Sequence, residues 1–590
     1  MKQPPKTISR KLAEATALLQ RGEFAAARAG FGAVLKFDPR NFDALHFAGI
    51  AAAQMEHPEE GEALIRRALE VNPRHAAAHS NHGSALIRLN RYEDALVSLD
   101  RAIVLDPNGA NAHQNRGIAL MRMKRFKDSV AAFDCAIALK PNNAEAHNDR
   151  ACALMDQHKF EDALAGIEKA LSLRPGSPAF LVNKALVLSK LQRPAEALEV
   201  ADAALLGKPD DTSALIARTE ALLALGRPVD GLSTIEKALK ISPTLAQGHL
   251  WRSNAFILLG QPEKALVAAE TARTLAPEDA SVHRGYGFAL GHLNRLEEAI
   301  VSYDYTLKLQ PDDREASWNR ALALLLLGRF DDGWLAYEYR HFRNKTPAAR
   351  NYPKPLWWGK QPLKDQRLYI YWEQGLGDTI NFARYALLAA AAGAKVAFSV
   401  QDPLRRLFKG FEPAVTVIGQ NEAPTEFELH APLLTLPLAF GTRLETIPAL
   451  ENGYLTASPE DVARWDQRLP KGRRRIGLVW SGSQAHANDA NRSLALAKIS
   501  PLFQPGDVWV SLQKEVRDRD LAALAGSGIL DVSAELGDFA DTAALISALD
   551  LVISVDTSVA HLAGALGKPT WVMLPFAPDF RWLLDREDSP

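Results

Sequence analysis

The chain has 590 residues, which is enough for several domains. Its hydrophobic content of 47% and charged content of 24% are ordinary for a soluble globular protein. The net charge of −1 gives no basic field that would indicate a nucleic-acid partner. The two cysteines lack metal-ligand spacing, so we expect no disulfide and no metal site. The N-terminus lacks the apolar core of a signal peptide, and no run of about 18 apolar residues occurs, which predicts a cytoplasmic protein without a membrane span.

A period of 34 residues runs through the first 340 residues and is marked by nine prolines. They are Pro39, Pro73, Pro107, Pro141, Pro175, Pro209, Pro243, Pro277 and Pro311. If position 1 of a unit is set 31 residues before its proline, position 20 is small in every unit and position 24 is bulky in many. Position 8 is also small, and it is Gly49, Gly83, Gly117 or Gly287 in four units. Small residues at these positions indicate two helices that must touch.

A period of 34 with two helices per unit resembles the tetratricopeptide repeat. We therefore expect an α-solenoid of about ten units over residues 8–343, in which stacked units share one core. The first helix of each unit would line a concave groove. Position 6 of that helix is Asn81, Asn115, Asn183 and Asn319 in four units. An amide offers both a donor and an acceptor, which suits clamping an extended peptide backbone.

Asparagine ladders of this kind resemble those in the repeat domains of protein O-GlcNAc transferases. We therefore expect these four asparagines to bind an acceptor peptide. The alternative is a solvated polar face, because other units carry Asp149, Ala217, Trp251 or Gly285 at the same position.

The periodicity stops between residues 344 and 366, where prolines are frequent and Trp357 and Trp358 are adjacent. This composition predicts a linker. We expect the two tryptophans to pack the repeat array against the next domain, with an aromatic platform for the acceptor as the alternative.

The region 367–590 alternates apolar strand patterns with helix patterns, which indicates α/β structure in two halves, 367–455 and 456–590. In the first half, a strand at 368–372 leads into a glycine-rich turn with Gly377 and Asp378, and a helix follows over 382–392. Glycines there allow the backbone to approach a ligand closely. No P-loop lysine and no complete G-x-G-x-x-G occur, so a P-loop NTPase or dinucleotide enzyme is disfavoured.

The second half contains the most informative stretch, residues 551–574. Leu551–Val555 is a continuous apolar run typical of a buried parallel strand. Asp556 ends it, and the hydroxyl of Thr557 or Ser558 can cap the helix that follows. Gly567 ends that helix. A strand, a polar turn and a helix N-terminus form an anion site, which we expect to hold the diphosphate of a nucleotide sugar.

The pair Gly377-Asp378 and the stretch Asp556-Thr-x-x-x-His561-Leu-Ala-Gly-Ala-Leu-Gly-Lys-Pro569 resemble the heptosyltransferase family of GT-B glycosyltransferases. The fold class that this resemblance implies is an α-solenoid followed by a GT-B domain of two Rossmann-like halves. The fusion to repeats resembles bacterial protein glycosyltransferases, including those that modify flagellin before export.

The resemblance implies a role for each matching residue. Asp378 would be the general base, with a helix N-cap as the structural alternative. The residues implied at the donor site are Gly377, Arg492, Lys514, Asp556, Thr557, Ser558 and His561. Arg492 stands where the family has a lysine near the phosphates, and Lys514 has a surface position as its alternative. The K-x-W-P motif of the family is absent, and Arg492-Ser-Leu-Ala replaces it. No Asp-x-Asp motif occurs, so we expect a metal-independent enzyme with no cofactor besides its nucleotide-sugar co-substrate.

The sequence thus predicts a protein O-glycosyltransferase that modifies a serine or threonine of an acceptor held by the repeat groove, with flagellin as one candidate. One alternative is a repeat scaffold or chaperone with a degenerate glycosyltransferase domain. Another is a transferase that acts on lipid or polysaccharide. The resemblances leave the donor open among ADP-heptose, CMP-linked nine-carbon sugars and UDP-GlcNAc.

Overall fold

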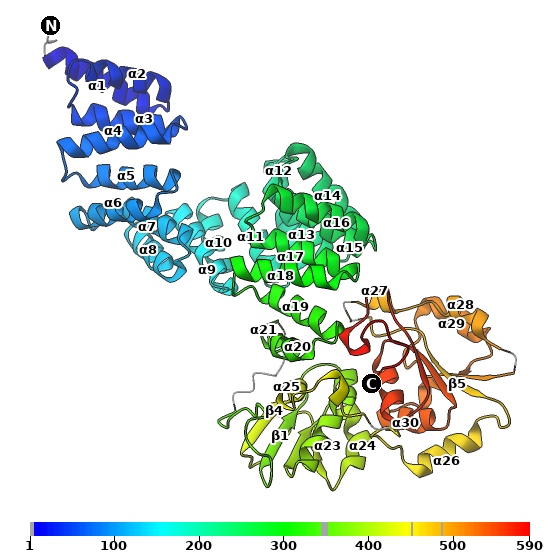
Figure 1. Ribbon diagram of the computed structural model, residues 1–590. Coiled ribbons are helices and arrows are strands. Elements are labelled where there is room, and N and C mark those ends of the chain that lie inside the picture. Colours follow the sequence, from blue (N-terminus) through cyan, green and yellow to red (C-terminus); the bar gives the residue numbers. More distant parts are fainter. Residues whose placement is uncertain are drawn as a thin grey trace. The chain divides into compact units, whose positions relative to one another are not determined.

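The computed structural model of this protein describes residues 5–343, 352–449, 452–484, 486, 488–504 and 506–589. The chain forms two compact units, Met1–Gln261 and Pro262–Pro590. Figure 1 shows stacked helices in the first unit, and further helices with two sheets in the second. The predicted fold class, an α-solenoid followed by an α/β region, is confirmed. Of the predicted linker 344–366, residues 344–351 lie outside the described part of the chain.

The first unit consists of antiparallel helix pairs. The helices are α1 (Pro5–Gln20), α2 (Phe24–Leu35), α3 (Phe42–Gln54), α4 (Pro58–Val71), α5 (Ala76–Arg88), α6 (Tyr92–Leu105), α7 (Ala110–Arg122), α8 (Phe126–Leu139), α9 (Ala144–Asp156), α10 (Phe160–Leu173), α11 (Pro178–Lys190), α12 (Pro194–Gly207), α13 (Thr212–Ala224), α14 (Pro228–Ile241) and α15 (Ala246–Leu258). The periodic prolines lie in or beside the turns that follow the second helix of each pair.

At position 8, glycine leaves space for the bulky side chain of position 24. A Cβ on Gly83 would lie 2.5 Å from a side-chain atom of Leu99, and one on Gly117 would lie 2.7 Å from the ring of Phe133. Leu99 and Phe133 are fully buried. Each glycine therefore opens the surface of one helix to a large side chain of its partner, and that contact forms the core of the repeat.

Replacing Gly117 by alanine is expected to lower the free energy of unfolding by about 1–3 kcal/mol, because the buried Phe133 ring would have to move. The matched control is Gly32→Ala in α2, where a Cβ would meet nothing within 4 Å. That change should stabilise the protein by up to about 1 kcal/mol, through helix propensity alone. Urea unfolding followed by circular dichroism measures both. Equal midpoints for the two variants would contradict this account of the packing.

The second unit begins with the remaining repeat helices. They are α16 (Pro262–Leu275), α17 (Ala280–His292), α18 (Leu296–Leu309), α19 (Arg314–Leu326), α20 (Phe330–Tyr337) and α21 (Arg340–Arg343). The first α/β half follows, with β1 (Arg367–Tyr371), α22 (Leu376–Phe382), α23 (Arg384–Ala391), β2 (Lys395–Ser399), α24 (Arg405–Phe408), β3 (Val415–Ile418), β4 (Leu429–Pro432) and α25 (Leu436–Ala439). Its strands form a parallel sheet in the order β3-β2-β1-β4.

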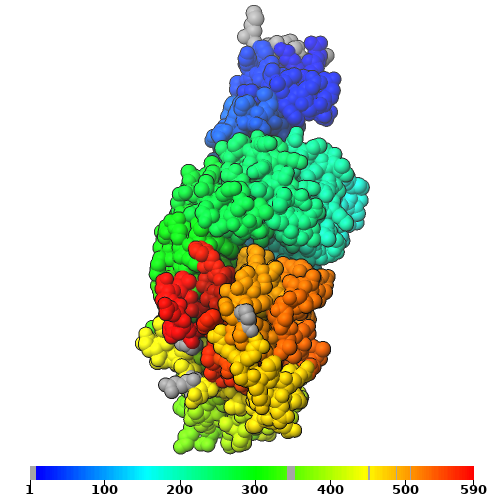
Figure 2. Space-filling model, turned by 90° about the vertical axis from the view of Figure 1, so that its right-hand side faces the viewer, coloured from blue at the N-terminus to red at the C-terminus, as the bar shows by residue number. Residues whose placement is uncertain are grey.

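The second half contains α26 (Pro459–Arg468), β5 (Arg475–Val479), α27 (Asp489–Arg492), α28 (Leu496–Ile499), β6 (Val508–Ser511), α29 (Asp518–Ala525), β7 (Leu530–Asp531), α30 (Phe539–Ser547), β8 (Leu551–Val555), α31 (Ser558–Ala565) and β9 (Thr570–Met573). Its parallel sheet has the order β7-β6-β5-β8-β9. Short 3-10 turns lie between the helices and strands of both halves. Those of the first half are η1 (Asp402–Leu404), η2 (Lys409–Phe411), η3 (Leu433–Thr435) and η4 (Leu444–Thr446). Those of the second half are η5 (Ser500–Leu502), η6 (Ser533–Glu535) and η7 (Phe580–Trp582). In Figure 2 the end of the chain is red and lies next to the orange part of the second half.

Buried charges and aromatic rings join the last repeat to the first α/β half. Arg340 has a side chain that is only 2% exposed, and its guanidinium donates to both carboxylate oxygens of Glu373 at 3.2 and 3.0 Å. It also donates to Thr435 Oγ1 at 2.7 Å and pairs with Glu338 at 2.5 Å. Trp334 Nε1 donates to the carbonyl of Thr442 at 3.1 Å.

The paired tryptophans have different surroundings. Trp357 packs edge-on against Phe440, at 5.0 Å between ring centroids, and it belongs to the same buried cluster as Trp334 of the last repeat. Trp358 is 44% exposed. The predicted packing role therefore stays a prediction for Trp357 and does not extend to Trp358.

Candidate functional site

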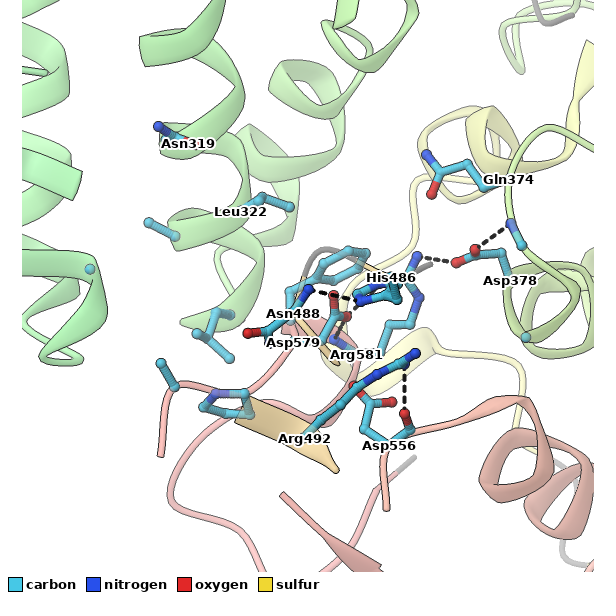
Figure 3. A pocket seen from close by; sticks show the side chains of 18 of the residues that line it. Asn319, Leu322, Gln374, Asp378, His486, Asn488, Arg492, Asp556, Asp579 and Arg581 are labelled. Carbon is cyan, nitrogen blue, oxygen red and sulfur yellow. Dashed lines mark hydrogen bonds and ion pairs between the residues drawn. The ribbon is translucent and has the colours of Figure 1, made fainter. Parts of the chain in front are cut away.

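A cavity of about 790 Å³ lies in the second unit, and three parts of that unit line it. The repeat helices α17, α18 and α19 form one side, and the glycine-rich turn before α22 forms another. Loops at the carboxyl ends of β5, β8 and β9 form the third. In parallel α/β folds, ligands bind at this end of the strands. The predicted site residues that line the cavity are Asn319, Gly377, Asp378, Arg492, Asp556, Thr557, Ser558 and His561. Figure 3 shows several of them around one space.

The two α/β halves are in close contact at Gly377. A Cβ at this position would lie 3.1 Å from Cδ2 of His561 and 3.3 Å from Cα of Ser558. The first turns of α22 and α31 therefore pack together, and a larger residue would separate them. The predicted close backbone approach does occur at Gly377, but it is an approach to the opposite half.

The first turn of α31 is open to a ligand. Thr557 occupies the N-cap position, yet its side chain makes no capping hydrogen bond, and its hydroxyl lies 3.2 Å from Ser554 Oγ instead. The expectation that the Thr557 or Ser558 hydroxyl caps this helix is therefore wrong. Uncapped N–H groups at a helix N-terminus attract anions. Gly567 has φ +68° just beyond the last turn, so the predicted helix end is confirmed.

Arg492 lies beside this turn. Its Nη1 donates to the backbone carbonyl of Asp556 at 2.8 Å, and a Cβ on Gly482 would lie 2.7–2.8 Å from its guanidinium atoms. A salt bridge between Asp489 and Arg517, at 2.7 Å, fixes the α27 turn from which Arg492 extends. Among the residues that the structure describes, Arg492 Nε is buried without a hydrogen-bond partner. The guanidinium thus has unused capacity next to the open helix turn.

Asp378 is the third residue of α22 rather than its N-cap, and its two carboxylate oxygens have different partners. Its Oδ2 accepts a hydrogen bond from the Gly375 N–H at 2.9 Å, which closes the first turn of α22. Its Oδ1 pairs with Arg581, and its side chain is 19% exposed toward the cavity. The helix begins at Leu376 rather than at Phe382 as predicted, so Gly377 and Asp378 belong to its first turn. The Gly375 N–H and the Arg581 guanidinium thus use different oxygens of the same carboxylate.

Burial shifts the pKa of two further groups at the start of α31. Burial, assisted by Arg581, lowers the pKa of His561 to about 3, so its ring is neutral at pH 7 and stacks on Trp582 at 4.9 Å between centroids. Burial, assisted by nearby Asp579, raises the pKa of Asp556 above its usual range. His561 can therefore donate or accept a hydrogen bond, but it adds no positive charge.

Lys514 does not belong to the site. Its Nζ donates to the backbone carbonyl of Ser533 at 3.2 Å and to that of Leu536, and the residue is not part of the cavity lining. Lys514 therefore fastens the loop after β7, which corrects its assignment as a phosphate ligand.

Of the four asparagines predicted to bind a peptide, Asn319 lies in the second unit and lines the cavity. In the first unit, the Asn81 amide bonds to His46 Nε2 at 2.9 Å, and Asn183 donates to Asn148 Oδ1 at 2.8 Å. These two side chains link neighbouring repeats, so they are only partly free to contact a peptide. Asn115 is partly buried on α7.

Sequence reasoning missed several residues that line the cavity. They are Gln374, Ser483, His486, Asn488, Asp579 and Arg581, together with the apolar wall of Phe288, Leu296, Leu322 and Leu326. Asp579 and Arg581 follow the carboxyl end of β9, so their position after the last strand was a usable signal. Among described residues, no group of three histidine, cysteine or acidic side chains is arranged to hold a metal ion. None of the described helices has the length and hydrophobicity of a membrane span.

Comparison with known proteins agrees with this architecture. Residues 508–572 match glycosyltransferase family 9 (heptosyltransferase). Tetratricopeptide-repeat families match residues 83–124, 115–178, 148–214, 182–246 and 289–343. The chain therefore carries tetratricopeptide repeats and a family 9 glycosyltransferase region.

The chain is similar to Protein FlbA of Caulobacter vibrioides, at 28% identity over 245 residues. The match covers 37% of this chain and 40% of that protein, so this chain spans less than half the length of the relative it matches. Among solved structures, it is similar to a thermophilic TPR protein of Thermus thermophilus, at 25% identity, 31% of this chain, 99% of that chain and a TM-score of 0.30. A tetratricopeptide repeat protein from Parabacteroides merdae matches at 15% identity, 42% of this chain, 98% of that chain and a TM-score of 0.37.

Proposed function

We propose that this chain, which joins tetratricopeptide repeats to a family 9 glycosyltransferase region, transfers a sugar from a nucleotide-sugar donor to a serine or threonine hydroxyl of a protein. The observation that carries the proposal is the shared cavity. Asp378 of the first half and Thr557 of the second face it, while Asn319 and Leu322 of a repeat helix form its remaining side.

The donor is placed against the second half. Its phosphates would take the unused N–H groups at the start of α31 and the guanidinium of Arg492. Negative charge grows on these phosphates as the bond from the sugar carbon to the phosphate oxygen breaks. Fixed positive charge and N–H donors stabilise that charge, which accelerates departure of the nucleotide. The proposed reaction is therefore independent of a metal ion and needs no further cofactor.

The acceptor is placed between the repeat helices and the first half. Its hydroxyl oxygen forms the new bond to the sugar carbon, and Asp378 takes the hydroxyl proton. Asn319 would hold the acceptor backbone, and the apolar wall that includes Leu322 and Leu326 would take its side chains. A protein acceptor gives the repeats a function, whereas a lipid or polysaccharide acceptor does not. We place the reaction in the cytoplasm, with flagellin as the first acceptor to examine.

Replacing Arg492 by glutamine is expected to raise the Kd of the donor nucleotide about 10- to 100-fold, because a charge-assisted hydrogen bond to phosphate is lost. The matched control is Lys514→Gln, which removes a cation of the same half that lies outside the cavity and should leave this Kd unchanged. Calorimetric titration of both variants makes the comparison. An equal rise in Kd for the two variants would contradict the assignment of the donor site.

The proposal as a whole is tested by thermal unfolding of the full chain with a panel of nucleotide sugars that includes UDP-GlcNAc, ADP-heptose and CMP-linked nine-carbon sugars. A donor that binds the native state raises the unfolding midpoint. The proposal expects such a rise for at least one donor, and the rise should be lost in Arg492→Gln. A chain that responds to no nucleotide or nucleotide sugar would instead be a repeat scaffold with a degenerate glycosyltransferase domain.

A further inference from the structure

Arg581 connects the two sides of the cavity. It belongs to η7, in the irregular segment after β9, and it reaches the first α/β half. Its Nη2 pairs with Asp378 Oδ1, and its Nη1 lies 2.6 Å from Asp579 Oδ1. Figure 3 shows the guanidinium extending from the loop of Asp579 to Asp378. Arg581 therefore holds the residue that the proposed reaction uses as its base.

In the part of the chain that the structure describes, the surroundings of Arg581 supply two carboxylates but leave one of its N–H groups without a hydrogen-bond acceptor. Its side chain is 11% exposed, and among the described residues its Nε is buried without a partner. The guanidinium lies over the ring of Phe580, at 4.4 Å from the centroid. Asp378 and Asp579 raise the pKa of Arg581 although burial opposes its charge. The group is thus a permanent cation that lines the cavity and has one N–H without an acceptor in the described chain.

The ion pair conflicts with the work of a base. An arginine paired with a carboxylate stabilises the charged form of that carboxylate, so the carboxylate draws the proton of an acceptor hydroxyl less strongly while the pair persists. The other oxygen of Asp378 is already occupied by the Gly375 N–H. While Arg581 stays in place, Oδ2 of Asp378 accepts the Gly375 N–H of the helix turn, and an acceptor hydroxyl has to share Oδ1 with the cation. Phosphate is a competing acceptor for arginine, because it offers several anionic oxygens in a matching geometry.

We infer that Arg581 exchanges partners during the reaction, leaving Asp378 for the donor phosphates, so that donor binding frees the base. This inference rests on the proposed function. Arg581 then joins Arg492 at the leaving group, and Asp378 Oδ1 turns to the acceptor hydroxyl. The carboxylate takes the hydroxyl proton, the acceptor oxygen bonds to the sugar carbon, and the bond from that carbon to phosphate breaks with its electron pair going to the nucleotide. Without a donor, the base stays occupied.

The exchange makes Asp378 a competitor of the donor for one cation. Calorimetric titration of the full chain with UDP, ADP, GDP and CMP, each compared with its nucleoside, tests this directly. For the nucleotide that binds the wild-type chain most tightly, Asp378→Asn should lower the Kd about fivefold, because Arg581 has lost a competing anion. Asparagine can still accept the Gly375 N–H, so the turn is retained. Arg581→Gln should raise the Kd about tenfold. Nucleoside binding should change in neither variant.

The outcomes of this titration distinguish a failure of the inference from a failure of the proposed function. Tighter nucleotide binding in Asp378→Asn supports the exchange, because a purely structural ion pair would give equal or weaker binding when broken. Equal or weaker binding in that variant overturns the inference alone, as does unchanged nucleotide binding in Arg581→Gln. If the wild-type chain binds none of the four nucleotides, the proposed function and the inference fail together. Circular dichroism melts without ligand confirm that each variant is folded.

Discussion

Replacing Asp378 by asparagine is expected to lower the rate of sugar transfer by about 10²- to 10⁴-fold, the range that a general base supplies. Asparagine has nearly the same shape and keeps an oxygen for the Gly375 N–H, so α22 should still begin at Leu376. It cannot accept the hydroxyl proton at neutral pH. The loss should therefore appear in kcat, while donor binding persists or strengthens. Initial rates with a saturating donor measure the effect.

The matched control is Asp402→Asn. Asp402 opens η1 in the same α/β half, is exposed and lies outside the cavity lining. That change should leave the rate within about twofold of wild type, since surface substitutions shift free energies by only a few tenths of a kcal/mol. Equal activity of Asp378→Asn and the wild-type chain would mean that Asp378 only caps the helix.

Replacing Arg340 by methionine is expected to lower the free energy of unfolding of the second unit by about 3–5 kcal/mol. The Glu373 side chain is 1% exposed and would remain as a buried charge with fewer partners. Glu373 also accepts the Leu434 N–H at 3.0 Å, and it directly precedes Gln374 and the glycine turn of the cavity. Loss of the pair should therefore loosen the turn that carries Asp378. The midpoint of thermal unfolding should fall, and the affinity for the donor should change.

A double mutant distinguishes a buried charge from simple loss of packing. Glu373→Gln keeps an acceptor for the Leu434 N–H but removes the negative charge. In the Arg340→Met background it should recover part of the lost stability, because position 373 then no longer holds an unpaired charge inside. The matched surface pair is Arg443 with Asp331, whose side chains are 64% and 68% exposed. Breaking that pair should cost less than about 1 kcal/mol. Additive losses from Arg340→Met and Glu373→Gln would contradict the buried-pair account.

The parts of the fold that local pattern determines could be predicted from the sequence. Leu551–Val555 is predicted and found as a strand at the same residues. A continuous apolar run of this length is typical of a strand that is buried on both faces. The repeat helices follow their 34-residue period, since every unit faces the same neighbours. Position 8 glycines point to close contacts that the structure locates at particular rings, such as Phe133 against Gly117.

What the sequence could not predict depends on contacts between distant residues. Strand β4 contains His430 and Pro432, which are not typical strand residues. A hydrogen bond of 3.0 Å between His430 Nε2 and the Lys354 carbonyl holds this histidine in place. Arg581 lies in an irregular segment without periodicity, and only the folded chain brings it to Asp378, 203 residues earlier. Lys514 follows a strand in the expected place, but backbone carbonyls compete for its ammonium group.

The same limits apply to the site. The matching motif identifies Asp378 and the α31 turn, because both depend on residues close together in sequence. The repeat helices on the opposite side of the cavity carry no such motif, and Leu322 and Leu326 look like ordinary core residues in the sequence. Their part in the cavity follows from how α19 packs within the second unit, which no local pattern encodes.

The central claim is that the cavity moves sugar from a nucleotide to a protein. The most direct measurement incubates the purified chain with each isotopically labelled nucleotide sugar and an extract of cells that lack this chain, and then counts label in the protein, lipid and polysaccharide fractions. With the wild-type chain we expect label in protein and the mass of a sugar on peptides that contain Ser or Thr. With Asp378→Asn we expect no label in protein above background. Label confined to lipid or polysaccharide, or equal labelling of protein by Asp378→Asn, would contradict the central claim.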